Sequence, residues 1–230
     1  MMLFVVSTPI GNLKDITFRA VETLGEVDFI ICEDTRVSSH LLNHYQIKKE
    51  MISLNAFSEE KKIEYVLGRI RNGEKSALIS DAGTPTISDP GNRLISAAIR
   101  EGIQVVPIPG VSAVITALSI AGLPTDAFVY EGFPPQKKGR QKFLSGLATE
   151  ERTIVLYEST YRIHKLLDEL NKYMPERIIV ICRELTKMFE EVLRGKAEEL
   201  ISRIGEKELK GEIVVVISPL NWIEKEIIDN

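Results

Sequence analysis

The chain has 230 residues, of which 44% are hydrophobic and 27% are charged, and its formal net charge is −4 at pH 7. This length fits one large domain or two small ones, and the composition is that of an ordinary globular protein. The slightly acidic charge argues against nucleic-acid binding over the whole surface. The N-terminus lacks the features of a signal peptide, no apolar run approaches the ~18 residues of a membrane span, and Cys32 and Cys182 lie in apolar runs. We therefore expect a cytoplasmic protein with buried, reduced thiols.

In the first half of the chain, strand-like apolar runs alternate with helical patterns. The strands are predicted at 3–7, 28–32, 76–80 and 104–107, and the helices at 37–45, 58–71, 92–101 and 112–121. Such alternation predicts a mostly parallel sheet with helices on its faces.

From residue 128 the pattern changes. Strand-like runs occupy 128–132, 153–158, 177–184 and 212–218, helices are predicted at 161–174 and 196–204, and 190–195 reads as a short strand or hairpin arm. The sequence therefore predicts an α/β fold of two domains, 1–112 and 127–220, joined by a helix and linker over 113–126 and followed by a tail at 221–230.

The loop that follows the predicted strand 76–80 is the most informative segment. Ligands of open α/β sheets bind outside the carboxyl ends of the strands, and Asp81 and Gly83 stand directly after such an end. We therefore expect Ser80–Pro85 to form a ligand wall. Further along this loop, Asp89 and Pro90 are predicted as the N-cap and first residue of the next helix.

Two other loops follow strand ends in the same way. Glu33 and Asp34 either handle a proton, with Arg36 binding a phosphate or orienting a carboxylate, or they simply cap the helix that follows. Ser112 either contacts a ligand beside Gly110 or serves as a plain N-cap.

The segment 137–142 carries four positive charges and no negative one. It is either a phosphate-binding patch or a solvated loop before a helix. Other chemistries find little support: the chain has no dinucleotide or P-loop glycine motif and no G-x-S-x-G elbow. His40 and His44 have the spacing of metal ligands but no third partner, so no metal site is expected.

Taken together, these loops resemble the tetrapyrrole methylase fold family, and within it the branch that methylates bacterial small-subunit ribosomal RNA. The resemblance runs from residue 3 to about 218. The matching segments are Ser7-Thr8-Pro9-Ile10-Gly11-Asn12, Glu33-Asp34-Thr35-Arg36, Ser80-Asp81-Ala82-Gly83-Thr84-Pro85, Asp89-Pro90-Gly91, Pro109-Gly110 with Ser112-Ala113, Gly132-Phe133-Pro134, Tyr157-Glu158-Ser159 with Arg162, and Arg183-Glu184 with Lys187.

This resemblance implies two domains of tetrapyrrole methylase type with S-adenosylmethionine in the cleft between them, and a homodimer. It implies 2′-O-methylation of a cytidine in the decoding centre of 16S ribosomal RNA. The cofactor contacts expected are Pro9, Ser80, Asp81, Ala82, Gly83, Thr84, Pro85, Ser112, Ala113 and Tyr157. The RNA contacts expected are Lys137, Lys138, Arg140, Lys142, Arg183 and Lys187.

The expected catalytic residues are Glu33, Asp34, Arg36 and Glu158, with Glu131 as a further possible base. Because the sulfonium is already a strong electrophile, the protein mainly positions the reactants and accepts the hydroxyl proton. Two alternatives stay open: methylation of a small tetrapyrrole, and a non-catalytic RNA-binding assembly factor.

Overall fold

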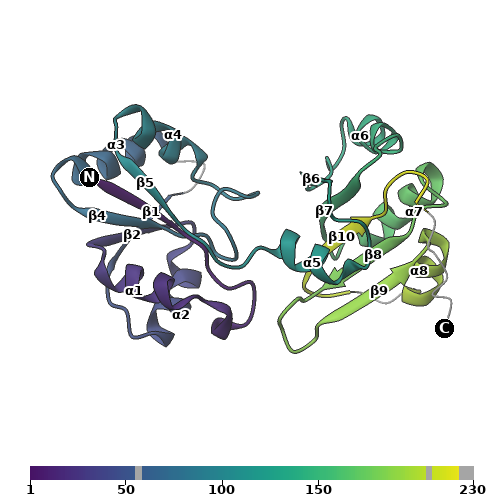
Figure 1. The fold of residues 1–230 in the computed structure, drawn as a ribbon, viewed down its shortest axis with the longest axis horizontal. Helices are drawn as coiled ribbons and strands as arrows, with labels where there is room; N and C mark the ends of the chain where they lie inside the picture. Colours follow the sequence, from purple (N-terminus) through teal and green to yellow (C-terminus); the bar gives the residue numbers. More distant parts are fainter. Residues whose placement is uncertain (55–58, 206–208, 223–230) are drawn as a thin grey trace. The chain divides into compact units, whose positions relative to one another are not determined.

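The computed structural model describes residues 1–54, 59–205 and 209–222, which form two compact units, Met1–Ser112 and a second that begins at Ala113 (Figure 1). In the described part of the chain, no helix has the length and apolar character needed to cross a lipid bilayer.

The first unit is a parallel sheet covered by helices on both faces. Its strand order is β3-β2-β4-β1-β5, and every pairing is parallel. The strands are β1 (Met2–Val6), β2 (Phe29–Cys32), β3 (Glu50–Ser53), β4 (Lys75–Leu78) and β5 (Gln104–Ile108). The helices are the 3-10 turn η1 (Leu13–Asp15), α1 (Phe18–Glu26), α2 (Thr35–His44), α3 (Glu59–Arg71) and α4 (Asn92–Arg100).

Successive residues of each strand enter two different apolar cores. Ile31 packs with α3 and α4 on one face, whereas Ile30 packs with α1 and α2 on the other (Figure 1). Both faces are thus covered, as a parallel sheet requires, and only the strand ends remain free to carry polar side chains. Strand β3 was not predicted, because this short edge strand begins with the exposed Glu50 and carries no strong apolar run.

Helix α4 begins at Asn92, which confirms the predicted start of the range 92–101, but its cap differs from the prediction. The N-cap is Gly91, at φ 120°, and no side chain caps the helix, so the assignment of Asp89 and Pro90 as N-cap and first residue was wrong. Positive φ angles at Thr86, Ser88 and Gly91 turn the chain before and after Asp89 and Pro90, so these two residues lie in the loop and not at the cap. By contrast, Asp34 does cap α2, since its Oδ1 accepts a hydrogen bond of 2.9 Å from the Arg36 backbone N–H.

The second unit has a mixed sheet of order β6-β7-β10-β8-β9, in which only β6 and β7 pair in parallel. The strands are β6 (Phe128–Gly132), β7 (Thr153–Ser159), β8 (Ile179–Arg183), β9 (Glu191–Gly195) and β10 (Glu212–Ile217). The helices are α5 (Ala113–Ala121), α6 (Arg140–Leu147), α7 (Ile163–Tyr173) and α8 (Ala197–Ile204).

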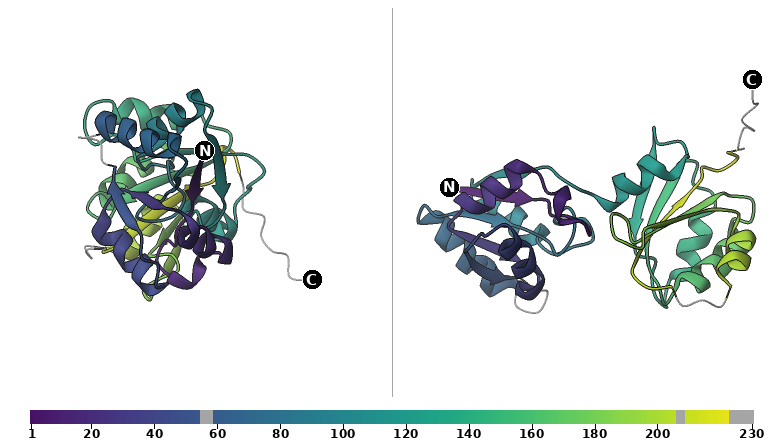
Figure 2. Two further views of the ribbon diagram at one scale, coloured as in Figure 1. Left: turned by 90° about the vertical axis from the view of Figure 1, so that its left-hand side faces the viewer. Right: turned by 90° about the horizontal axis from the view of Figure 1, so that it is seen from below.

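Helices α6, α7 and α8 bury one face of this sheet, and α5 packs against β10 on the other (Figures 1 and 2). The segment after α5 is also held in the unit, because Thr153 donates a hydrogen bond of 2.5 Å to the Pro124 carbonyl oxygen. The stretch 113–126, predicted as a connection, is therefore an integral part of the second unit.

Candidate functional site

The loops after β1 and β4 are fastened together at the carboxyl edge of the first sheet. The Thr8 N–H donates to the Gly83 carbonyl oxygen at 2.8 Å, and the Gly83 N–H donates back to Thr8 at 3.1 Å. The Thr8 hydroxyl also donates to the Ser80 carbonyl oxygen at 3.1 Å. These bonds hold the predicted ligand wall in one conformation.

The loop after β5 joins the same cluster. The Thr84 hydroxyl donates to the Val111 carbonyl oxygen at 3.0 Å and lies 3.1 Å from the Ser7 hydroxyl oxygen. A Cβ atom at Gly110 would lie only 2.9 Å from the Ser7 Cβ, so this close approach requires glycine. Three strand-end loops thus meet through hydroxyl and backbone groups.

The loop after β2 is linked to the cluster through two acidic residues. The Asp34 N–H donates to Asp81 Oδ1 at 3.3 Å. The exposed Arg36 guanidinium pairs with Asp34 at 2.6 Å, and these hydrogen bonds lower the pKa of the Asp34 carboxyl to about 2. Asp34 and Arg36 therefore form a fixed ion pair that shapes this loop.

The remaining carboxylates of this edge have no such partner. Burial raises the pKa of Glu33, as do the charges of Asp81 and Asp34, and burial likewise raises the pKa of Asp81. Burial beside Glu33 and Asp81 raises the pKa of Asp89 to about 6. None of these three carboxylates has an ion pair within the described ranges. The edge is therefore suited to a positively charged ligand.

The predicted catalytic residue of the second unit lies in a different environment. Glu158 is buried at 2% exposure and forms ion pairs with Arg162 at 2.8 Å and with Arg140 at 3.4 Å. Arg140 also pairs with Glu169 at 2.7 Å. The charges of these four side chains balance, and their ion pairs join α6, β7 and α7. The four residues therefore serve the fold of the second unit.

Three other predicted residues of this unit, Tyr157, Arg183 and Lys187, also have partners. Tyr157 makes edge-to-face contacts with Tyr130 and Phe133 at centroid distances of 5.1 and 5.5 Å. Arg183 pairs with Glu191 at 3.0 Å, and Lys187 bridges the carboxylates of Glu184 and Glu212. In the basic run, Lys137, Lys138 and Lys142 are exposed, whereas Arg140 is buried.

Sequence reasoning missed two members of the site. Ser7 was quoted only as part of a motif, although a hydroxyl at the end of an apolar strand is the signal that could have identified it. Asp89 was taken for a helix cap, because the sequence does not reveal the left-handed turns around it. Among the described residues, no group of His, Cys, Asp and Glu is arranged to hold a metal ion.

Comparisons with known proteins agree with this architecture. Residues 2–201 match the family of tetrapyrrole (corrin/porphyrin) methylases. The "Ribosomal RNA small subunit methyltransferase I" of Thermotoga maritima is 45% identical over 216 residues, which cover 94% of this chain and 97% of that protein.

Two solved structures share the fold. Cobalt precorrin-4 methyltransferase superposes with a TM-score of 0.72 at 19% identity, covering 94% of both chains. Uroporphyrin-III C-methyltransferase of Thermus thermophilus, complexed with S-adenosyl homocysteine, gives 0.66 at 17% identity and covers 95% of this chain and 97% of its own. The chain therefore belongs to the tetrapyrrole methylase family, and within it to the group of ribosomal RNA small subunit methyltransferase I proteins.

Proposed function

We propose that the protein transfers the methyl group of S-adenosylmethionine to the ribose 2′-oxygen of a cytidine in the decoding centre of 16S ribosomal RNA. The observation that carries this proposal is the 45% identity, over nearly the whole of both chains, to a protein named for methylation of small-subunit ribosomal RNA. The choice of nucleotide and of the ribose oxygen rests on the loop motifs described above.

The first unit offers groups that suit this cofactor. S-adenosylmethionine supplies an electrophilic methyl group on a sulfonium cation. The unpaired carboxylates at the sheet edge suit this positive charge, and the fold neighbour complexed with S-adenosyl homocysteine supports the assignment. We assign the cofactor contacts to Pro9, Ser80–Pro85, Ser112 and Ala113, and the assignment of Tyr157 stays a prediction.

Within this edge, the carboxylates take different roles. Asp81 contributes negative charge to the cofactor contact. Glu33 accepts the 2′-hydroxyl proton, since its raised pKa makes it a better base than Asp34, whose pKa is held at about 2. The ion pair of Asp34 and Arg36 positions this loop. Glu158 is left out because both of its charge partners belong to the fold of the second unit.

The test is transfer of radiolabelled methyl groups to small ribosomal subunits isolated from a strain that lacks the corresponding methyltransferase. We expect incorporation into 16S ribosomal RNA, and mass spectrometry of nuclease digests should place the label on a cytidine ribose. Label on a base would contradict the 2′-O assignment. The cytoplasmic location and the homodimer are part of the same proposal, and sedimentation of the purified protein tests the latter.

Two control reactions separate the alternatives. Incubation with uroporphyrinogen III, the kind of substrate that the fold neighbours' names suggest, should give no labelled product. Binding of the ribosomal subunit without any methyl transfer would identify a non-catalytic assembly factor and would overturn the proposal.

A further inference from the structure

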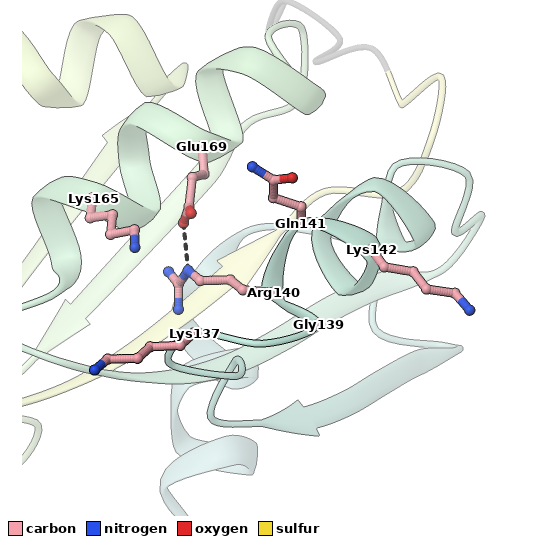
Figure 3. A pocket seen from close by; sticks show the side chains of 7 residues that line it. All are labelled: Lys137, Gly139, Arg140, Gln141, Lys142, Lys165 and Glu169. Atoms are coloured by element: carbon pink, nitrogen blue, oxygen red, sulfur yellow. Dashed lines mark hydrogen bonds and ion pairs between the residues drawn. The ribbon is translucent and has the colours of Figure 1, made fainter.

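The second unit contains a pocket of about 450 Å³ at the start of α6, which the chemistry described so far does not use. Side chains of α6, of the turn before it and of α7 surround it (Figure 3). The lining residues are Lys137, Gly139, Arg140, Gln141, Lys142, Lys165 and Glu169.

The base of the pocket is rigid and electrically neutral. The Arg140 guanidinium donates to Glu169 at 2.7 Å, as the dashed line in Figure 3 marks, and to the Pro135 carbonyl oxygen at 3.1 Å. It also contacts Glu158, whose second partner is Arg162. Two arginines and two glutamates therefore cancel in charge and fix the start of α6 against β7 and α7. Arg140 is a positioning residue and is not available to a ligand.

The three lysines around this base differ from Arg140, because their charges are not neutralised by a partner. Lys137, Lys142 and Lys165 are exposed, and none of their ammonium groups has a hydrogen bond or ion pair with any described residue. The pocket therefore carries about three uncompensated positive charges. No side chain caps α6 at Gly139, so the first-turn N–H groups add to this positive field.

We propose that this pocket binds the sugar–phosphate backbone of the RNA substrate, an inference that rests on the proposed function. Lysine ammonium groups bind phosphate as point charges and read no base. In Figure 3, Lys137 and Lys165 lie to one side of the Arg140 guanidinium and Lys142 extends to the other, which suits an extended polyanion better than a single small anion. The expected phosphate contacts differ from the basic run of the sequence. They include Lys165 of α7, which lines the pocket, and omit Lys138, which does not. They also omit Arg140, because its guanidinium is paired with Glu169.

The first experiment measures the salt dependence of binding to small ribosomal subunits. Each phosphate contact contributes about 0.7 to the slope of log K against log salt for single-stranded RNA. The variant K137Q/K142Q/K165Q should therefore lose about 2 from this slope. Its KM for the subunit should rise about tenfold or more at low salt, while kcat at saturating subunit and the Kd of S-adenosylmethionine stay unchanged.

The matched control is K48Q/K75Q/K172Q, which changes the net charge by the same amount at exposed lysines outside the pocket. Its slope should stay close to that of the wild type. Equal losses in the two triple variants would overturn the proposal, because they would show an effect of net charge alone.

A second pair of variants tests the footprint with one charge each. Lys165→Gln should reduce the slope by about 0.7, although this residue lies outside the basic run. Lys138→Gln should leave the slope unchanged, although this exposed residue lies inside the run but does not line the pocket. The reverse result would overturn the pocket in favour of a simple basic loop. If the wild type binds the subunit but methylates no RNA, the proposed function fails while these binding slopes remain interpretable.

Discussion

Each unit has a glutamate at the end of a strand, and the two glutamates show how the same sequence feature serves different purposes. Glu33 follows β2, has no cationic partner among the described residues, and has a raised pKa. Glu158 ends the buried part of β7 between Arg140 and Arg162. Because an unpaired carboxylate stores electrostatic energy that a ligand can relieve, whereas a paired one stabilises the fold, the partners of each glutamate indicate its role.

The largest effect is expected from Glu158→Gln. This change removes a fully buried charge and leaves two arginines without their shared partner. The free energy of unfolding should fall by about 3 kcal/mol or more in urea titrations. Glu169→Gln is the matched control, since Glu169 pairs with Arg140 alone and its side chain is 18% exposed. If the Glu158→Gln variant keeps its stability but loses kcat, Glu158 acts in the reaction and the role that we give it in the fold is wrong.

Glu33→Gln should act on the reaction and not on the fold. Loss of a general base lowers kcat by about 10²–10⁴-fold, and the limb of the pH–rate profile that reports this base should disappear. Stability should be maintained, because the change relieves repulsion from Asp81 and Asp34. Asp34→Asn is the control variant. It should keep the limb of the pH–rate profile that reports Glu33, even if the loop is loosened and the rate falls.

Asp81→Asn should weaken the binding of S-adenosylmethionine without altering the proton transfer. Removal of one charge from a charge-assisted contact costs about 1.5–3 kcal/mol, so the calorimetric Kd of S-adenosylmethionine should rise roughly 10- to 100-fold. The fold should tolerate the change, since the amide oxygen can still accept the Asp34 N–H. An unchanged Kd would refute the assignment of Asp81 to the cofactor.

The sequence alone predicted the alternating elements of the first unit well, because buried strands and amphipathic helices have distinct periodicities. It also placed Ser80–Pro85 correctly at the end of β4, since strand order and turn residues decide this position. It did not separate Glu33 from Glu158 or Arg140 from Lys137. Those distinctions depend on partners far along the chain, such as Glu169 for Arg140, which local patterns do not encode.

A smaller effect, on the free energy of unfolding, is expected at Asp89, another carboxylate of the first unit that has no ion pair among the described residues. The pKa of this carboxyl is raised to about 6 in the folded protein, from an ordinary value of 3.8. A carboxyl whose folded pKa is raised favours folding only while it is protonated, so its stabilisation is complete below pH 4 and is lost as the pH rises through 6.

Asp89→Asn should keep the side chain neutral and remove this loss. After a discount for its partial exposure to solvent, we expect the variant to gain about 1 kcal/mol in urea unfolding at pH 7.5 and close to nothing at pH 4. Glu150→Gln is the control of opposite sign, because hydrogen bonds from Arg152 lower the pKa of Glu150 from 4.5 to about 2. Its stabilisation is complete well above pH 4.5 and is lost as the pH falls, so the destabilisation caused by Glu150→Gln should be larger at pH 7.5 than at pH 4. If Asp89→Asn raises the free energy of unfolding equally at both pH values, the amide stabilises the loop for reasons other than charge. The unpaired carboxylates of this edge would then repel one another less than their raised pKa values imply.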